Sequence, residues 1–592
     1  MTTLLLIAVF LPLAAAMAPI GSRMPMRRWA LGASLLSLAG AIALAACYPA
    51  GDESFAATDL AWLASAALPL DVRFSLALDG LSLWLFVLTA LLAVVAVLVG
   101  WESIRDQTSL YYRLLLILET GMLGVFVARD ILLFYLFFEF TLVPLFFVIG
   151  IWGSDQRRYA AIKFFLFTLT GSVLTLLGLL AIVIWDAYGP NASVAGGMTF
   201  SIPELTRRLT EHPMPPGLQL WIFLALFAGF AIKVPLVPLH TWLPLAHVEA
   251  PAAGSVLLAG VLLKIGTYGF VRFNLPLLPD ATALCMPWLL GLSVAGILYG
   301  ALAALAQSDL KRLIAYSSVS HMGFCMLGVF ALNRLSVQGG VLQMVNHGLS
   351  TGGLFAVVGM LYERYHTRQI ADLGGIAQET PRLAFFMVFL TFSSIGLPGL
   401  NGFVGELLVL LGMFQRGWTG PSTPWTPEYR VISVLATSGV VLGAWYMLSL
   451  VRRVFFGPLG PREHAAPIRD LGFREIAALV PLLAAIVWIG VQPCFFLDRM
   501  APTLDQLTRP AMRAAELKVA GTLRVPSAQK VAGTLRVPSA ESREDATHRG
   551  GGQSHFRCAK IGTVPSPAVP SPENRDGPQP RIQETVEFAR DP

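Results

Sequence analysis

The feature that most constrains this chain is a series of apolar runs, each long enough to cross a bilayer as a helix of about 20 residues. Only 13% of the 592 residues are charged and 55% are hydrophobic. A soluble domain carries roughly 25% charged residues, so the composition indicates an integral membrane protein. The runs occupy residues 2–20, 29–47, 80–100, 110–128, 131–152, 160–185, 218–238, 251–274, 285–306, 312–331, 338–361, 383–414, 431–455 and 475–497. They predict an all-α polytopic membrane protein with about fourteen transmembrane helices.

The rest of the composition excludes several classes of protein. The net charge of +6 is spread over the ends of apolar runs, and no run of five or six basic residues suggests nucleic-acid binding. The five cysteines form no CxxC pair, and no GxGxxG motif follows a strand-like segment. We therefore expect no metal site, nucleotide site or redox cofactor on this chain.

The loops indicate an orientation in the membrane. The first apolar run lacks a basic residue before it, so a retained helix is favoured over a cleaved signal peptide. Arg and Lys are more frequent in the loops after odd-numbered runs, which include Arg23, Lys311 and Arg312. Because such residues stay on the inner side, both termini are predicted on the outer face.

Two segments differ from the apolar runs. SIPELTRRL, residues 201–209, has apolar residues on one helical face, which suits a helix along the membrane surface or a solvated loop helix. After residue 497 the chain becomes polar, and KVAGTLRVPSA occurs at 518–528 and again at 530–540. We predict a transmembrane domain over 1–497 and a disordered extension over 498–592, with a small docking tail as the alternative.

One carboxylate stands in the middle of an apolar run. Residues 131–150 are ILLFYLFFEFTLVPLFFVIG, and Glu139 is the one side chain among them that is charged at neutral pH. A charge at the centre of a bilayer costs at least about 2.5–3.5 kcal/mol, so such residues generally have a partner and a function.

Further titratable groups lie in other apolar runs. They are Lys233, His240, His247, Lys264, His321, His347 and Glu406. Histidines in membranes often hydrogen-bond between helices, so His240 and His247 have structural roles as an equal alternative. An ion pair of Glu139 and Lys233 that only fixes packing is a second alternative, and Glu119 cannot be assigned from the sequence.

Two of these runs contain helix breakers at mid-membrane depth. Pro235 and Pro238 follow Lys233, and GLPGLNG precedes Glu406. Broken helices at corresponding positions in two halves of a chain are typical of transporters with inverted repeats and an ion path at the midplane. The spacing of about 160 residues fits two inverted five-helix repeats.

The charges suggest how such a path would work. A nearby carboxylate favours the charged form of a lysine, and desolvation favours the neutral form. Movement of Glu139 relative to Lys233 would then switch the lysine between binding and releasing a proton. Lys264, His321 and His347 are candidate relays, and Glu406 is the candidate last carboxylate.

Several stretches also resemble a known family. They are LFYLFFEFTLVPLFFVIGIWG, AIKVPLVPLHTWLPLAHVEAPAAGSVLLAGVLLKIGTYGFVRF, AYSSVSHMGF, QMVNHGLSTGGLF and LPGLNGFVGE. The chain resembles the antiporter-like membrane subunits of proton-pumping NADH–quinone oxidoreductase, or complex I. Glu406 stands where subunits L and N of that family usually have lysine. Subunit L continues into a long lateral helix and another span, and no apolar run of that length follows residue 497 here.

The resemblance implies roles for the matching residues. Glu139 and Lys233 become the coupling pair, Lys264 the central relay and Glu406 the last carboxylate. His240, His321 and His347 fall at positions that the family uses along its hydrated axis. One departure is Leu245, since the family commonly has WLPDAH where this chain has WLPLAH; Glu249 is the nearby acid that is a candidate to replace it.

The resemblance also implies a function: proton translocation driven by electron transfer from NADH to quinone in partner subunits. NADH, flavin, iron–sulfur clusters and quinone would belong to those partners, which include the neighbouring subunits L and N in a bacterial inner membrane. The alternatives are a subunit of a multi-subunit sodium–proton antiporter, a subunit of an energy-converting hydrogenase, and a scaffold that has lost pumping. The intact set of Glu139, Lys233, Lys264 and Glu406 argues against the scaffold.

Overall fold

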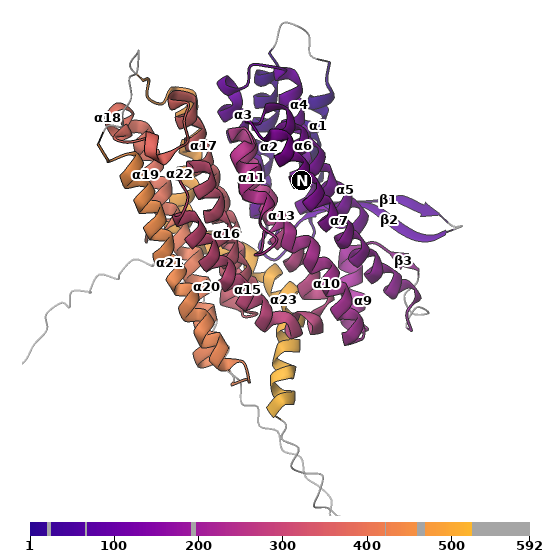
Figure 1. Ribbon diagram of the computed structural model, residues 1–592. Helices are drawn as coiled ribbons and strands as arrows, with labels where there is room; N and C mark the ends of the chain where they lie inside the picture. Colours follow the sequence, from indigo (N-terminus) through magenta and orange to yellow (C-terminus); the bar gives the residue numbers. More distant parts are fainter. Residues whose placement is uncertain (20–24, 66–67, 191–196, 421, 459–467, 524–592) are drawn as a thin grey trace, which may run out of the picture. The chain divides into compact units, whose positions relative to one another are not determined.

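The computed structural model describes residues 1–19, 25–65, 68–190, 197–420, 422–458 and 468–523. The tandem copy at 530–540 and the rest of the extension lie outside these residues. The described part is a helical bundle with a small β-hairpin that projects from its side (Figure 1).

The elements alternate between long spans and short connecting pieces. The first half contains α1 (Thr2–Met17), α2 (Met26–Cys47), β1 (Phe55–Ser65), β2 (Leu68–Leu78), α3 (Leu83–Ser103), α4 (Thr108–Val127), α5 (Ile131–Phe140), α6 (Leu142–Trp152), α7 (Arg157–Tyr188), β3 (Met198–Thr199), α9 (Ile202–Glu211), α10 (Pro216–Lys233) and α11 (Trp242–Glu249).

One long central helix follows, and two π-helical turns interrupt it. Its parts are α12 (Ala252–Leu257), η1 (Leu258–Leu262), α13 (Leu263–Gly269), η2 (Phe270–Asn274) and α14 (Leu275–Leu277). The second half contains α15 (Pro279–Leu305), α16 (Leu310–Phe330), α17 (Arg334–Tyr365), η3 (Ile370–Asp372), α18 (Ile376–Glu379), α19 (Pro381–Ser394), α20 (Asn401–Phe414), η4 (Gln415–Thr419), α21 (Thr426–Val454), α22 (Phe473–Val491) and α23 (Pro493–Leu523).

The membrane-spanning pattern agrees with the sequence. Twelve helical stretches in the described part of the chain are long and apolar enough to cross a membrane, and α1 and α19 are shorter apolar helices. Twelve plus two gives the fourteen predicted spans, with α19 continuing after a break as α20. The prediction of an all-α polytopic membrane protein is confirmed.

Both predicted breaks are present. The first separates α10, which ends at Lys233, from α11, which begins at Trp242. The Trp242 indole N–H donates to the Ile232 carbonyl across this break at 2.9 Å, so one freed carbonyl keeps a partner inside the protein. The second break separates α19 from α20. The relation of the two halves as inverted repeats stays a prediction.

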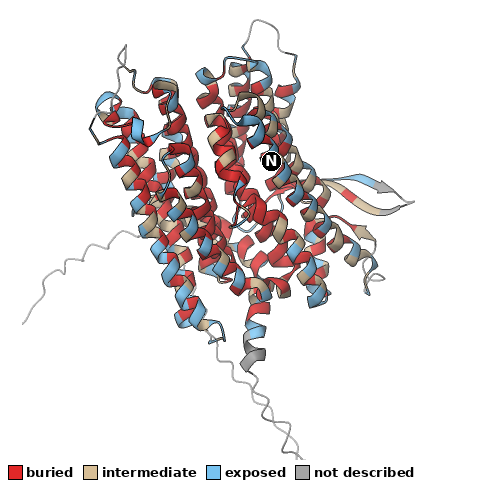
Figure 2. Ribbon diagram, in the orientation of Figure 1, coloured by how far each residue is buried: buried red, intermediate tan, exposed pale blue. Residues whose placement is uncertain are grey.

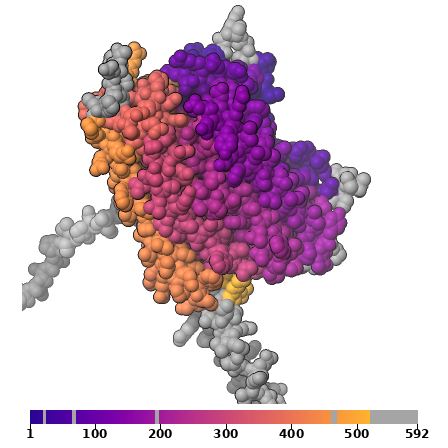
Figure 3. All heavy atoms as spheres, in the orientation of Figure 1, coloured from indigo at the N-terminus to yellow at the C-terminus, as the bar shows by residue number. Residues whose placement is uncertain are grey.

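The most buried helices form the middle of the bundle. The central helix over 252–277 and most of α16 and α17 are buried, whereas α7, α21 and α22 keep many apolar side chains exposed, as lipid-facing or subunit-facing helices do (Figure 2). On the face drawn in Figure 3 the magenta middle of the chain lies between the indigo and orange parts. The titratable residues singled out from the sequence are mostly on the buried helices.

The segment between α2 and α3 forms a small sheet. β1 and β2 pair antiparallel, and Asp71 of β2 pairs with Thr199 of β3 in parallel. The surface helix predicted at 201–209 exists as α9, with its apolar face buried. On its polar face the Arg207 guanidinium binds Glu204 and lowers the pKa of this carboxyl to about 2.

The prediction of disorder from residue 498 is wrong for the first part of the extension, because α23 continues to Leu523. Its charged residues and two prolines resemble a disordered composition, but Phe496, Met500 and Leu504 share one buried face. This face lies against α14, α15 and α17 at the end of the bundle where the hairpin emerges. We call this end of the bundle, which carries the chain segments 48–82 and 493–523, the hairpin end.

Candidate functional site

Four of the predicted residues form a continuous buried chain. The Lys264 ammonium lies 2.6 Å from His347 Nδ1, and the ring centroid of His347 is 5.7 Å from that of His321. His321 Nδ1 in turn lies 3.2 Å from Glu406 Oε1. All four side chains are buried on different elements, namely α13, α17, α16 and α20. The sequence could name these residues, but the contacts between them depend on how the helices pack.

The backbone supports this chain on both sides. Lys264 follows the π-helical turn η1 directly, and its ammonium also donates to the Ala259 carbonyl within that turn. Such turns free backbone groups and often occur at functional sites. At the other end, Glu406 is in the first turns of α20, just after the second break.

The coupling pair of Glu139 and Lys233 makes fewer direct contacts than the residues around Lys264 and Glu406. Lys233 is the last residue of α10, 4% exposed, and its ammonium lies 4.7 Å from the centre of the Phe138 ring. Glu139, on α5, acts on this ammonium through space. No ion pair within 4 Å joins the two in the described part of the chain, so the direct carboxylate–ammonium contact expected from the sequence is absent.

A set of amides and hydroxyls around Glu406 was missed in the sequence. The Gln343 side-chain amide donates to Glu406 Oε1 at 3.2 Å. The Asn346 side-chain amide in turn donates to the side-chain oxygen Oε1 of Gln343 at 3.2 Å. Ser350 and Ser393 lie 2.6 Å apart beside them. The signal was available, because 343, 346, 347 and 350 fall on one helical face.

These groups enclose a small polar space. A cavity of about 10 Å³, the size needed for one water, is lined by His321, Gln343, Asn346, His347, Ser350, Thr351, Ser393, Ser394 and Gly402. His347 Nε2 and Asn346 Oδ1 are buried without hydrogen-bond partners among the described residues. Buried polar atoms of this kind commonly bind ordered water, and a water here would connect the two histidines.

At the end opposite to the hairpin end, His247 extends the buried polar groups toward the surface. It is 0% exposed, and its ring stacks on Phe355 with centroids 4.4 Å apart. Lys264 and Lys311 both act on it electrostatically. Lys311 lies in the first turn of α16, is itself buried and donates to the Ala250 carbonyl at 2.8 Å.

Two other predicted residues lie among different neighbours. His240 packs edge-on against Tyr299, with ring centroids 4.9 Å apart. Near Leu245, which is partly buried against the core, Glu249 accepts the backbone N–H of Gln156 at 2.9 Å. Glu249 therefore anchors the 153–157 turn, and its role in place of the missing acid stays a prediction.

Glu119, which the sequence left unassigned, lies on the face of α4 that meets α2. Ser34 donates to its Oε2 at 2.6 Å, and the residue is 1% exposed. Its partners Ser34 and Ser37 are on α2, and neither is a residue of the Lys264–Glu406 chain.

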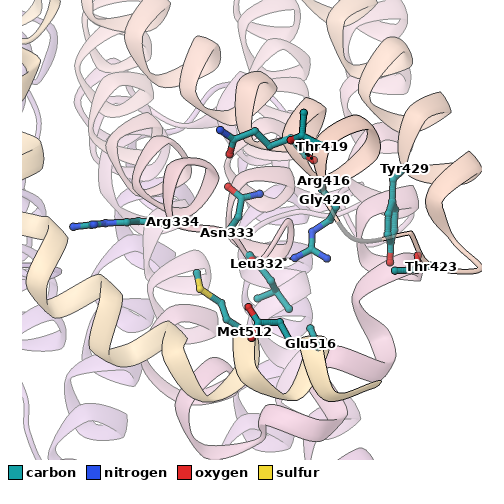
Figure 4. A pocket seen from close by; sticks show the side chains of 12 residues that line it. Leu332, Asn333, Arg334, Arg416, Thr419, Gly420, Thr423, Tyr429, Met512 and Glu516 are labelled. Carbon is teal, nitrogen blue, oxygen red and sulfur yellow. Dashed lines mark hydrogen bonds between the residues drawn. The ribbon is translucent and has the colours of Figure 1, made fainter. Parts of the chain in front are cut away.

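A larger pocket lies at the hairpin end and contains none of these residues. It has a volume of about 380 Å³, and Figure 4 shows Met512 and Glu516 of α23 reaching it opposite Arg416. The Arg416 guanidinium donates to the carbonyls of Ala331 and Leu332, where α16 ends. This arrangement closes the end of α16. No group of three residues able to hold a metal ion occurs in the described part of the chain.

Comparison with known proteins now identifies the family. Residues 128–421 match a family described as "NADH:quinone oxidoreductase/Mrp antiporter, TM". NADH-quinone oxidoreductase subunit M of Rhodobacter capsulatus is 41% identical over 522 residues, which are 86% of this chain and 97% of that protein. NADH-ubiquinone oxidoreductase chain 4 of Arabidopsis thaliana is 42% identical over 74% of this chain and 83% of that protein. The chain belongs to the family of antiporter-like membrane subunits of NADH–quinone oxidoreductase.

Solved structures agree with this assignment. A chain of respiratory complex I from Thermus thermophilus with bound NADH is 32% identical, with a TM-score of 0.73, covering 86% of this chain and 99% of that one. A chain of the Mrp complex from Dietzia sp. DQ12-45-1b shares the fold at a TM-score of 0.71 and 20% identity, covering 87% of this chain and 100% of that one.

Proposed function

We propose that this chain is a proton-translocating membrane-arm subunit of NADH–quinone oxidoreductase. The observation that carries the proposal is the buried chain from Lys264 through His347 and His321 to Glu406. Each member can bind or release a proton, and intramembrane ionisable residues are functional by default. Two distances of 2.6 and 3.2 Å at its ends are within reach for proton transfer.

Glu139 and Lys233 control when a proton is bound or released. Lys233 rests on the face of Phe138, which stabilises an ammonium, and Glu139 adds an attraction that changes with distance. Glu139 itself is half-buried beside exposed Leu136 and Val143 on the side of the bundle. A neighbouring subunit on this side would therefore move Glu139 and change the proton affinity of Lys233.

The helices that carry the two lysines pack closely. A Cβ atom at Gly266, two residues after Lys264, would lie 3.0 Å from Lys233 Cβ. Only a glycine lets the end of α10 approach α13 in this way. A change of charge at Lys233 is thus felt at Lys264, and from there the proton moves along the histidines to Glu406.

We place this chain beside the other antiporter-like subunits, L and N, of the same membrane arm. The hairpin carries Leu60, Trp62 and Leu63 exposed on β1, which suits contact with a neighbouring subunit at the membrane surface. NADH, flavin, iron–sulfur clusters and quinone would be bound by partner subunits. In a bacterial inner membrane the hairpin end would face outward, together with both termini.

The alternative is ion exchange without redox coupling. The Mrp complex of Dietzia has the same fold, and so does a chain of an archaeal membrane-bound sulfane sulfur reductase, at 24% identity and a TM-score of 0.68 over 83% of this chain and 76% of that one. Both fit the antiporter and hydrogenase-like alternatives by fold alone. The 41% identity to subunit M over nearly its whole length favours the complex I function.

The deciding measurement is NADH-driven proton pumping in membrane vesicles that contain the assembled complex with Lys233→Ala. We expect pumping and the coupled NADH–quinone rate to fall together, by tenfold or more, because about 1.4 kcal/mol suffices for each factor of ten. Lys163→Ala is the matched control, since Lys163 lies partly exposed near the end of α7 over the ring of Phe167.

The two functions give opposite results. If NADH oxidation and pumping persist in Lys233→Ala while sodium–proton exchange is lost, the chain works as an antiporter and the proposal is wrong. Equal losses in the Lys163→Ala control would show that any lysine change disturbs assembly.

A further inference from the structure

A second cluster of buried charges lies on the helix of Lys264, nearer the hairpin end. Asp79 Oδ2 lies 2.6 Å from the Arg272 guanidinium and 3.2 Å from that of Arg129. The second oxygen of Asp79 accepts the backbone N–H groups of Leu81 and Ser82 at 3.1 and 3.0 Å. The carboxylate is 1% exposed and Arg272 is 5% exposed. None of these three residues belongs to the proposed proton path.

The cluster carries one excess positive charge. Two guanidinium groups share a single carboxylate, and arginine stays protonated in proteins. The other charged group that acts on Arg129 is Glu53, which is exposed to solvent. The buried part of the cluster is therefore +1, an arrangement that packing alone does not require, since one arginine would neutralise Asp79.

The same helix leads from the proton path to this cluster. Lys264, Tyr268 and Arg272 follow each other at intervals of four residues, so they lie on one helical face over about 12 Å. The Tyr268 hydroxyl accepts from Arg272 at 3.1 Å and donates to the Phe126 carbonyl at 3.3 Å. Thr267 and Asn274, beside this ladder, have buried polar atoms without partners among the described residues. Buried polar atoms of this kind commonly bind ordered water.

The cluster lies next to α23, which packs against the residue that follows Asp79. Gly80, the neighbour of Asp79, donates its N–H to Thr503 Oγ1 at 3.1 Å. A Cβ atom on Gly80 would lie 2.4 Å from the Arg499 carbonyl oxygen, so α23 packs on the backbone at this point. The Trp84 indole also donates to the Phe496 carbonyl at 3.3 Å. The charged cluster thus stands between the Lys264 ladder and the surface of the hairpin end.

We propose that Arg272 and Arg129, held by Asp79, form an electrostatic barrier that keeps protons from passing between Lys264 and the hairpin end. This inference rests on the proposed function and adds the residues that set the route. Fixed positive charge in a narrow polar passage excludes cations and protons. With this branch closed, a proton on Lys264 has its favourable route through His347 and His321 to Glu406.

Variants that change the net charge of the cluster in opposite directions distinguish an electrostatic barrier from a cluster that only holds the helices together. Arg272→Gln and Asp79→Asn both break the shortest ion pair, but Arg272→Gln lowers the buried charge from +1 to 0, and Asp79→Asn raises it to +2. The test is the decay of an imposed pH gradient in vesicles with the assembled complex, without NADH. We expect Arg272→Gln to leak about tenfold faster through this subunit, the factor for one charge removed about 12 Å from a proton at an effective dielectric constant of about 20. Asp79→Asn and Arg272→Lys should not leak faster than wild type.

Further variants cover failures of assembly and the route of the leak. If Arg272→Gln does not assemble, Arg129→Gln has the same charge of 0 and should leak in its place. Adding Lys264→Ala to either variant should remove the leak. Arg208→Gln is the control. Arg208 of α9 pairs with Asp186 of α7 at 2.8 Å, away from Lys264, Tyr268 and Arg272.

Each outcome decides the matter. A leak in Asp79→Asn as large as in Arg272→Gln would show a plug that depends on packing, and a leak that survives Lys264→Ala would show another route; both overturn the barrier. Unchanged decay in the two charge-0 variants overturns it as well, even where wild-type vesicles pump with NADH. Loss of the proposed function itself would appear separately, as wild-type vesicles that do not pump.

Discussion

The two broken helices differ in how their ionisable residues are held. At the second break, Glu406 is fixed by contacts: Gln343 donates to it and His321 lies 3.2 Å away. At the first break, Lys233 has an aromatic face and a carboxylate that acts through space. A residue held by contacts keeps one geometry, whereas a residue held through space responds to small movements. The difference suggests a switch in the first half and a fixed relay in the second.

Shortening each carboxylate by one methylene is the strongest way to break this comparison. Glu406→Asp withdraws the carboxylate from the Gln343 amide that donates to it and from His321, which lies 3.2 Å away. The loss of the one hydrogen bond to this charged group, about 1.5–3 kcal/mol, predicts about a tenfold fall in NADH-driven pumping. Glu139→Asp changes the distance to Lys233 and loosens only the hydrogen bond to Tyr135 on its own helix, so we expect less than about a threefold fall. Equal losses in the two variants would refute the division into switch and relay.

Removing one supporting amide is the next largest change. Gln343→Leu deletes a donor to Glu406 and one of two acceptors of the Asn346 amide, which still donates to the Asn401 carbonyl at 2.8 Å. We expect pumping to fall by about three- to tenfold with normal assembly, since the remaining contact to His321 still holds Glu406. The matched control is Gln307→Leu, because Gln307, just after the end of α15, donates its side-chain amide to the Ala303 carbonyl of that helix at 2.7 Å, away from Glu406. If the control falls as far, the loss does not come from the relay.

From the sequence, the two helix breaks and the ionisable residues could be predicted, but the contacts between those residues could not. The breaks follow from local chemistry, since proline removes a backbone donor and GLPGLNG contains glycines with positive φ at 396 and 399, so both were located correctly. The ionisable residues stand out against apolar surroundings for the same reason. Their pairing does not, because it depends on the packing of α13, α16, α17 and α20.

Polar residues without charge were harder to find. Gln343 and Asn346 share a helical face with His347 and Ser350, but this pattern does not say which distant residue they face, so their place beside Glu406 appears only in the structure. The same holds for Asp79, which lies just before a span and resembles an ordinary loop acid until Arg272 of a distant helix contacts it. α23 was missed because its apolar residues lie on one face of a mostly polar segment, so the mean hydropathy of the segment stays low.

A change of packing between the two lysine helices tests the switch with a smaller effect. In Gly266→Ala the new Cβ would lie 2.8 Å from the Phe230 carbonyl oxygen and 2.7 Å from Val234 Cγ2, so α10 must move away from α13. Overpacking of this kind costs about 1–3 kcal/mol, and we expect a lower melting temperature of the complex and about a twofold to threefold loss of pumping. Gly296→Ala is the control, since nothing lies within 4 Å of its added Cβ. A Gly266→Ala complex that loses stability but pumps normally would show that Lys233 and Lys264 do not communicate through this contact.

The smallest effect is expected at Glu119, a buried carboxyl outside both halves of the comparison. Ser34 donates to it at 2.6 Å, and Ser37 beside it donates to the Ala8 carbonyl, so these groups join α1, α2 and α4. Glu119→Gln keeps an oxygen that accepts from Ser34, and pumping should change by less than about twofold, or about 0.4 kcal/mol. Glu119→Leu removes that acceptor and should lower the melting temperature, because the Ser34 hydroxyl then stays buried without a partner. If Glu119→Gln instead abolished pumping while the complex assembled, burial of a carboxyl would matter more than its contacts. The distinction drawn between Glu139 and Glu406 would then lose its physical basis.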